Sequence, residues 1–239
     1  MKVRASNPSH HGEPSTQEAS GRDRRRSPGR PRLPLTRIVA TAMEIVNRDG
    51  PDALSMRALA DALESGTATL YRHVSGRPAL EALLVDAVFA QLDLADDGDE
   101  WRSRTAGLAR GMYEALRRHP GVAPLMLRST PNGPNAMKHR ERCIALLQAE
   151  GFAAGEAAVI YATLAHYVLG STLQLIRHDD RSAQAFEAVD PAAYPATRAA
   201  AATGRLPVAP EDEFSYGLEL MLDGLEGRRP TAPSAVTAP

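Results

Sequence analysis

The chain has 239 residues, 43% of them hydrophobic and 24% charged, which is enough to bury a sizeable core in one or two domains. Its single cysteine excludes an intramolecular disulfide framework. We also expect no apolar run long enough to span a membrane and no signal-peptide core, and these three features together favour a cytoplasmic protein. The net charge of -1 divides unevenly, because residues 1–77 hold 13 Lys or Arg against 8 Asp or Glu and the remainder holds 15 against 21.

Residues 1–33 are rich in Pro, Ser and Gly, which predicts a disordered arm. Most of the basic excess lies in this arm, in six arginines: Arg22, Arg24, Arg25, Arg26, Arg30 and Arg32. Two interpretations stay open. The arm binds a polyanion such as DNA, through salt-sensitive phosphate contacts or the minor groove, or it is a solvated tail with no specific role.

The first predicted helix begins with Thr36 as its N-cap and stops at Gly50 and Pro51, which end helices. Its apolar residues recur on one face: Ile38, Val39, Ala42, Ile45 and Val46. Ser55 then caps a short helix with its own apolar stripe: Met56, Leu59, Ala60 and Leu63.

A second short helix is predicted to begin near Thr67. Leu70 and Val74 share one side and are its expected buried anchors, while Ala68 and Arg72 point the opposite way. The exposed face therefore carries small side chains at the start of the helix and cationic side chains further on, which suits a helix that enters the major groove of DNA. An ordinary helical hairpin with solvated polar residues is the alternative for these two helices alone.

A longer helix follows from Arg77, with the apolar residues Leu80, Leu83, Leu84, Ala87 and Val88. This helix order, with the string Thr69-Leu70-Tyr71-Arg72-His73-Val74 and the later Arg77 and Ala79-Leu80, strongly resembles the TetR family of transcriptional repressors over residues 35–92. The resemblance implies that nine residues contact bases or backbone of DNA: Ser55, Arg57, Thr67, Ala68, Thr69, Tyr71, Arg72, His73 and Arg77.

One departure from the family pattern falls in the turn between the two short helices. The family commonly has Gly followed by an apolar residue there, whereas this chain has Glu64 and Ser65, with Gly66 two places along. Either Glu64 adopts a left-handed conformation at some cost, or the turn re-forms around Gly66. Glu64 also puts a carboxylate close to DNA.

Helical patterns dominate the rest of the chain after an acidic loop at residues 96–100. The predicted helices cover residues 101–118, 122–128, 135–150, 155–178 and 211–227, with an Ala- and Pro-rich connection over residues 180–210. The chain is therefore predicted to be all-α, in three parts after the arm. These are a three-helix helix-turn-helix DNA-binding domain at residues 34–80, a helical effector-binding and dimerisation domain at residues 81–227, and a disordered tail at residues 228–239.

The C-terminal part is similar to the tetracycline-repressor branch, through Trp101, Gly151-Phe152 and the stretch His166-Tyr167-Val168-Leu169-Gly170. The resemblance implies that this part binds a small molecule and pairs two chains. Tetracycline repressors hold a drug–magnesium chelate with a His and a Glu, and the matching positions here are Met126 and Gln174. A thioether and a neutral amide are poor ligands for a hard cation, so we expect no metal or other cofactor and a largely apolar effector.

Helical faces and the resemblance together name ten candidate contacts for the effector: Met112, Tyr113, Leu116, Met126, Arg140, Cys143, Leu147, Tyr161, His166 and Gln174. A plain core role is the alternative for each, because a lone buried cysteine, or a histidine on an apolar helix, more often packs than senses or binds. His119, His139 and His178 have no spacing that builds a site.

The helices around residues 155–178 and 211–227 are the predicted dimerisation surface. The first is apolar nearly all round, and the second carries one stripe: Leu218, Met221, Leu222 and Leu225. A helix too apolar for a surface needs a partner, and the alternative is that both helices pack only within one chain.

These features predict a homodimeric transcriptional repressor that binds a palindromic DNA operator and is released by a small-molecule effector, with the helix at residues 77–92 as the lever. The alternative is a ligand- or protein-binding helical module whose head binds DNA without specificity. An enzyme is not expected, since the sequence has no Gly-rich phosphate loop, no His-Glu-x-x-His and no Gly-x-Ser-x-Gly motif.

Overall fold

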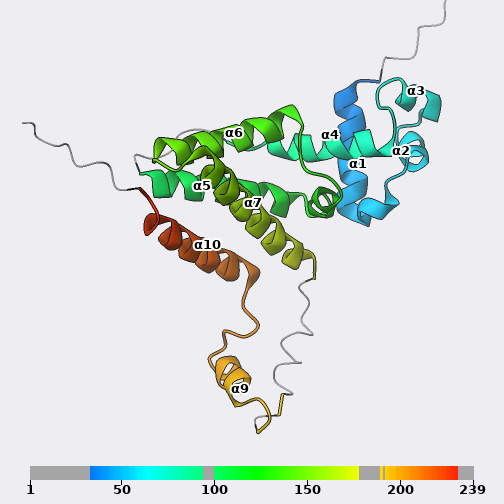
Figure 1. The fold of residues 1–239 in the computed structure, drawn as a ribbon. Helices are drawn as coiled ribbons and strands as arrows, with labels where there is room; N and C mark the ends of the chain where they lie inside the picture. The colour runs from blue at the N-terminus through cyan, green and yellow to red at the C-terminus, as the bar shows by residue number, and fades with distance from the viewer. Residues whose placement is uncertain (1–32, 94–99, 178–188, 191, 231–239) are drawn as a thin grey trace, which may run out of the picture. The chain divides into compact units, whose positions relative to one another are not determined.

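The computed structural model describes residues 33–93, 100–177, 189–190 and 192–230 (Figure 1). Residues 1–32 of the predicted arm (1–33), His178 and residues 231–239 of the predicted tail (228–239) lie outside the described residues. Every regular element within the described residues is a helix, which confirms the predicted all-α class with an N-terminal helix-turn-helix and a C-terminal helical domain.

Four elements form the part that we call the head, residues 33–76: α1 (Leu35–Asp49), the 3-10 turn η1 (Pro51–Ala53), α2 (Met56–Ala62) and α3 (Thr67–Tyr71). Helix α4 (Arg77–Phe89) follows the head. Residues 100–230 form the body, with α5 (Trp101–Arg118), the 3-10 turn η2 (Ala123–Leu127), α6 (Pro134–Ala149), α7 (Ala154–Arg177), α9 (Pro195–Ala202) and α10 (Pro210–Glu226).

The start of α1 differs from the prediction. The helix begins at Leu35 with Pro34 as its N-cap, and no side chain caps it, so Thr36 lies exposed inside the first turn. The fixed φ of Pro34 prepares the chain for a helix, and its carbonyl accepts hydrogen bonds from the amides of Arg37 and Ile38. The predicted end is confirmed, because Gly50 terminates α1 with φ of 83°.

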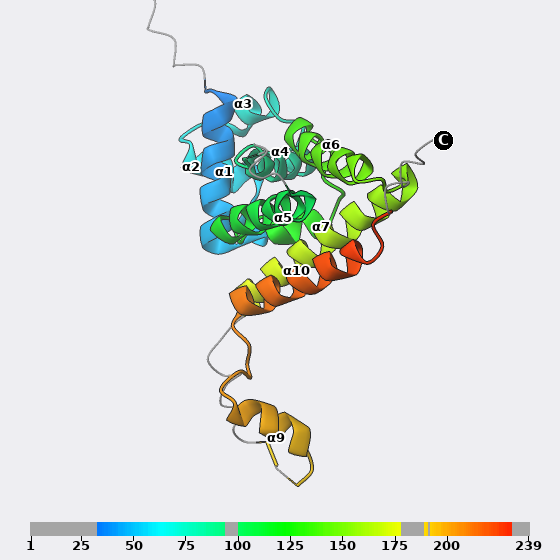
Figure 2. The ribbon, with the colours of Figure 1, turned by 90° about the vertical axis from the view of Figure 1, so that its left-hand side faces the viewer.

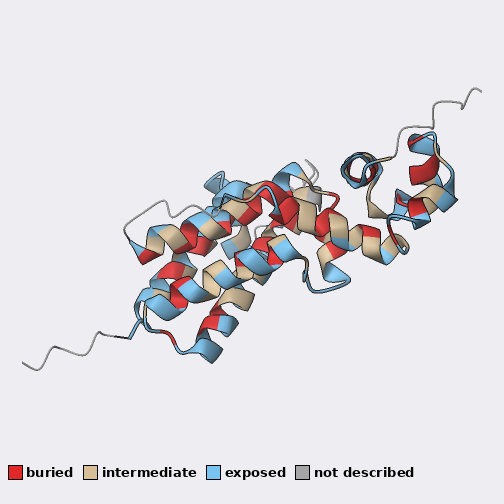
Figure 3. Ribbon diagram, turned by 90° about the horizontal axis from the view of Figure 1, so that it is seen from above, coloured by how far each residue is buried: buried red, intermediate tan, exposed pale blue. Residues whose placement is uncertain are grey.

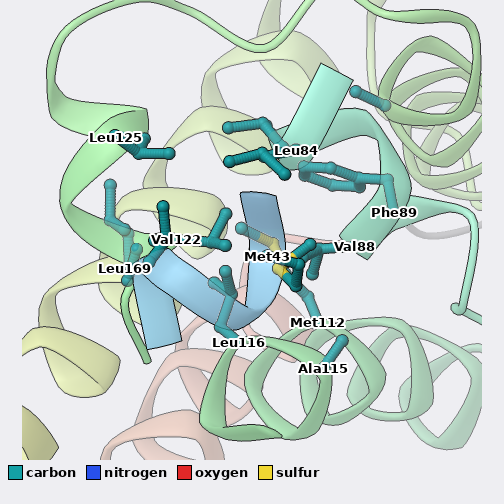
Figure 4. Packing of buried hydrophobic residues seen from close by; sticks show 14 of the residues in the cluster. Met43, Leu84, Val88, Phe89, Met112, Ala115, Leu116, Val122, Leu125 and Leu169 are labelled. Carbon is teal, nitrogen blue, oxygen red and sulfur yellow. The ribbon is translucent and has the colours of Figure 1, made fainter. Parts of the chain in front are cut away.

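One continuous hydrophobic core runs from the head into the body. Figure 4 shows its middle, where Met43 of α1 and Val88 of α4 lie with Leu116 of α5. The close approach of the backbones is visible at Gly121, where a Cβ atom would overlap the carbonyl of Val46 at the end of α1. Helix α4 thus belongs to both parts, packing on α1 at one side and on α5 and α6 at the other.

Helix α7 packs on α5, α6 and α10 but leaves much of its surface uncovered (Figures 1 and 3). Residues 154–175 have a mean hydropathy of 1.2, and only 22% of that window is buried. By length and composition this helix is apolar enough to cross a membrane, a test that core helices of soluble proteins also pass. The expectation that no apolar run reaches this length is therefore wrong.

The predicted connection at residues 180–210 contains a further helix, α9, which the sequence interpretation missed. Its sequence begins with Pro195 and ends in four alanines, and alanine is the strongest helix former. None of its residues is buried, and Figures 1 and 2 both show it away from the other helices. Local propensity, rather than packing, accounts for this helix.

Candidate nucleic-acid interface and ligand cavity

The first helix of the predicted DNA-reading pair is fixed at its start by a side-chain cap. Ser55 Oγ accepts a hydrogen bond of 3.0 Å from the amide of Ala58, as the sequence predicts. Leu59 and Ala60 anchor the helix in the core, with 0% and 2% of their surface exposed. Arg57, on the same helix, is exposed.

The turn that follows is built on Glu64. Among the residues that the structure describes, it is the non-glycine residue whose φ is positive, at 50°. The Ser65 amide donates to the Ala60 carbonyl at 2.9 Å, and the Glu64 amide donates to the Asp61 carbonyl at 3.1 Å. This pair of bonds is a Schellman motif, in which glycine usually holds the left-handed position. Gly66 instead has an extended conformation, with φ of -78°, so the first of the two predicted turn geometries is confirmed.

Helix α3 is anchored on one side only. Leu70 is fully buried and Val74 is 4% exposed, which confirms the predicted anchors. The opposite face is open, with Thr69 half-buried and five of the predicted DNA contacts exposed: Thr67, Ala68, Tyr71, Arg72 and His73. The head therefore presents a short helix that is anchored by two buried side chains. Its exposed side carries small residues first and cationic or aromatic residues later.

Arg77, the last of the predicted DNA contacts, is engaged on the protein. Its Nε donates to Glu81 Oε1 at 2.8 Å, and its Nη2 donates to the Pro51 carbonyl at 3.1 Å. Arg128 of the body joins the same cluster, donating to Glu81 Oε1 at 3.1 Å and to Asp52 Oδ1 at 2.8 Å. The cluster ties the head, α4 and the body together.

A second polar junction links α4 to the first turn of α6. Asp86 Oδ1 accepts hydrogen bonds from the amides of Asn135 at 2.8 Å and Ala136 at 3.1 Å, and its Oδ2 accepts one from Asn135 Nδ2 at 2.8 Å. A carboxylate at a helix N-terminus satisfies amides that have no partner within the helix. The fit is tight, since a Cβ atom on Gly133 would overlap Asp86.

A cavity lies in the body between α5, α6 and α7. The space enclosed between the helices is small, about 20 Å³, and its mouth is open to solvent. The lining is almost entirely apolar, with one histidine, one cysteine, one tyrosine and one threonine: Thr105, Leu108, Ala109, His139, Cys143, Leu146, Leu147, Tyr161, Leu164 and Ala165.

The ten predicted effector contacts divide between different places. Cys143, Leu147 and Tyr161 line the cavity. Met112 and Leu116 line a smaller hollow that faces Phe89 of α4. The other five lie outside both linings: Tyr113, which stacks on Phe214 with ring centroids 3.9 Å apart, half-buried Met126 and Arg140, and the exposed His166 and Gln174 of α7.

The sequence interpretation missed His139, which is 3% exposed and lines the cavity. Its spacing to the other histidines indicates no metal site, and spacing alone does not predict a place in a cavity wall. The available signal was its position one helical turn before Cys143, which puts both side chains on one face of α6.

The uncovered sides of α7 and α10 carry apolar residues. On α10, Phe214, Leu218 and Leu222 are buried against the body. Tyr216 and Leu220 point away from them and are 70% and 55% exposed, and Val159 of α7 is 66% exposed. The two helices pack closely where a Cβ atom on Gly217 would overlap the hydroxyl of Tyr167. We call the uncovered sides of the two helices the outer face.

Comparisons with known proteins match both parts of the chain. The family model for bacterial regulatory proteins of the tetR family matches residues 38–80, and that for the tetracyclin repressor-like C-terminal domain matches residues 94–229. An HTH-type transcriptional regulator of Saccharopolyspora erythraea is 34% identical over 67% of this chain and 70% of its own. The HTH-type transcriptional repressor DrrR1 of Streptomyces coeruleorubidus is 32% identical, over 87% of this chain and 82% of its own.

A solved structure gives the same match in three dimensions. The crystal structure of ActR from Streptomyces coelicolor in complex with actinorhodin has a TM-score of 0.72 and 28% sequence identity, covering 83% of this chain and 99% of that one. The solved structure that matches most of this chain, head and body, is thus one of a protein with a bound ligand.

Proposed function

We propose, because this chain belongs to the tetR family of bacterial regulatory proteins, that it is a repressor that binds a palindromic operator as a homodimer and is released by a small effector in its body. The relatives are ligand-responsive DNA-binding regulators rather than enzymes, and we infer the same role here, in the cytoplasm. The observation that carries the proposal is the solvent-exposed side of α3, which lies opposite two buried anchors, Leu70 and Val74.

The outer face supports the homodimer. Exposed large apolar side chains on two adjacent helices are costly in water, and a second copy of the same face covers them. Pairing also places two reading helices on one duplex, where half-sites one helical turn apart require about 34 Å between them. We therefore propose that α7 and α10 meet their counterparts in the partner subunit.

Two junctions support α4 as the lever between cavity and head. Asp86 of α4 holds the N-terminus of α6, and α6 supplies His139, Cys143 and Leu147 to the cavity. A ligand that opens the cavity by displacing α6 therefore pulls on α4 and, through the cluster of Arg77 and Arg128, on the head. To lower the operator affinity a hundredfold, the effector must bind the released state more tightly than the DNA-competent state by about 2.7 kcal/mol.

Selection of bound sites from random DNA tests the proposal. The full chain should enrich a palindrome, and Tyr71→Ala in the head should weaken binding to it. Tyr194→Ala, at the residue just before α9, is the matched control, because that tyrosine is 60% exposed against 55% for Tyr71. If no sequence is enriched, and random DNA competes equally at every salt concentration, the head is non-specific and the alternative function holds.

A further inference from the structure

The cavity contains one buried polar group that lacks a strong partner. His139 Nε2 lies 3.4 Å from the carbonyl oxygen of Leu108, which is long for a hydrogen bond. Because a carbonyl oxygen only accepts, this contact assigns the ring hydrogen to Nε2 and leaves Nδ1 as an acceptor. The sulfur of Cys143 lies at similar distances from both ring nitrogens, 3.9 Å from Nδ1 and 3.8 Å from Nε2, and a thiol is only a weak donor to Nδ1.

Aromatic rings surround this acceptor. The ring centroid of Phe89 lies 5.6 Å from that of His139, and the centroid of Tyr161 lies 6.2 Å away. Both rings are tilted against the imidazole, by 58° and 57°. Of the two, Tyr161 lines the cavity and can offer its ring to a further flat ring, while Phe89 packs behind the imidazole, and the aliphatic lining adds apolar contact.

The lining carries no formal charge at neutral pH. Burial lowers the pKa of His139, raises the pKa of the Cys143 thiol to about 12 and raises the pKa of Tyr161, so all three side chains are neutral. Arg140 stands outside the lining, with its guanidinium 5.6 Å from the Tyr161 ring centroid and one donor on the Pro131 carbonyl at 3.0 Å. A charged ligand therefore loses its hydration without gaining a counter-ion from the lining.

We propose that the cavity binds an uncharged aromatic compound with a hydroxyl group, which donates a hydrogen bond to Nδ1 of His139. The proposal rests on the effector site proposed above and names its chemistry. The hydroxyl replaces the weak thiol contact of Cys143, and the aromatic part enters between α5, α6 and α7 as α6 is displaced and the cavity widens. His139 thereby sets which compounds the body accepts.

The test uses three probes of similar shape, 2-naphthol, naphthalene and 2-naphthoate, titrated at pH 7 into the full chain without DNA. We expect calorimetry to show 2-naphthol binding more tightly than naphthalene by roughly fivefold to tenfold, the value of one hydrogen bond. We expect 2-naphthoate to bind more weakly than both. His139→Leu should remove the advantage of 2-naphthol over naphthalene, which is read from the ratio of the two affinities in the same variant.

His166→Leu is the matched control, because His166 lies exposed on α7 outside the lining. A second variant, His139→Gln, keeps a hydrogen-bond acceptor and should retain part of the preference for 2-naphthol, and thermal melting verifies that each variant folds. The proposal is overturned if His139→Leu keeps the full preference, if 2-naphthoate binds best, which would identify Arg140 as the anchor, or if no probe binds. Operator binding is measured separately, so its failure would affect the proposed repressor function alone.

Discussion

The head and the body use the same kind of helices in opposite ways. In the head, short helices are held by fully buried side chains such as Leu54, Leu59 and Leu70, and the polar residues that we propose contact DNA stand on that fixed support. In the body, α5, α6 and α7 enclose a cavity and leave a buried histidine without a strong partner. The contrast suggests a division of work, in which the head keeps its shape and the body changes it.

Truncating one leucine in each part should give the largest difference. Leu70→Ala leaves a void under α3, and we expect it to lower the free energy of unfolding by about 2–5 kcal/mol and abolish operator binding. Leu147→Ala removes the same atoms from the cavity wall, where the side chain is 1% exposed. We expect that variant to be destabilised as well but to bind the operator normally once folded, and to bind naphthalene more tightly.

Urea unfolding and operator titrations, made on the same samples, separate these effects. If Leu147→Ala weakens the operator complex as much as Leu70→Ala does at equal folded fraction, the proposed division between head and body is wrong. An undisturbed operator complex in Leu70→Ala would contradict it equally.

The same contrast explains how far the sequence could be interpreted. The cap at Ser55 and the anchors Leu70 and Val74 are local signals, readable within a few residues, and the structure confirms each. For the turn the sequence left two geometries open, and the structure has the one with Glu64 in a left-handed conformation. The cavity is formed by helices far apart in the sequence, so no local pattern distinguishes Cys143 in its wall from Tyr113 against Phe214. His139 shares a face of α6 with Cys143, but that local spacing does not show that the face lines a cavity.

Disrupting the outer face should have the next largest effect. Leu220→Glu puts a carboxylate where we propose that two subunits meet, and burying that charge without a partner is costly. We expect sedimentation to show monomers, and operator affinity to fall by roughly a hundredfold or more because one reading helix is lost. Leu127→Glu, at a residue 65% exposed but on η2, is the control and should remain dimeric. A dimeric Leu220→Glu variant would place the interface elsewhere.

The two junctions between α4 and the body should differ in strength. Asp86→Ala removes three hydrogen bonds from the start of α6, and we expect a loss of about 1–2 kcal/mol in unfolding free energy, as for other N-caps. Arg128→Ala removes an exposed ion pair to Asp52 and a half-buried one to Glu81, and because the guanidinium itself is solvated we expect a loss of about 1 kcal/mol or less. Raising the salt concentration should shrink only the second loss. A larger loss in Arg128→Ala would make the charge cluster the main link.

The smallest effect should come from the turn in the head, the place where the rigid part is itself strained. Glu64→Gly relieves the left-handed backbone, but glycine also gains freedom in the unfolded chain, so we expect a net stabilisation of only about 0.5–1 kcal/mol in urea unfolding. Glu64→Ala separates conformation from charge, because it keeps the Cβ atom and removes the carboxylate. Both variants should bind DNA slightly more tightly at low salt, and only the glycine variant should be more stable. If alanine stabilises the head as much as glycine, the cost of Glu64 is electrostatic rather than conformational.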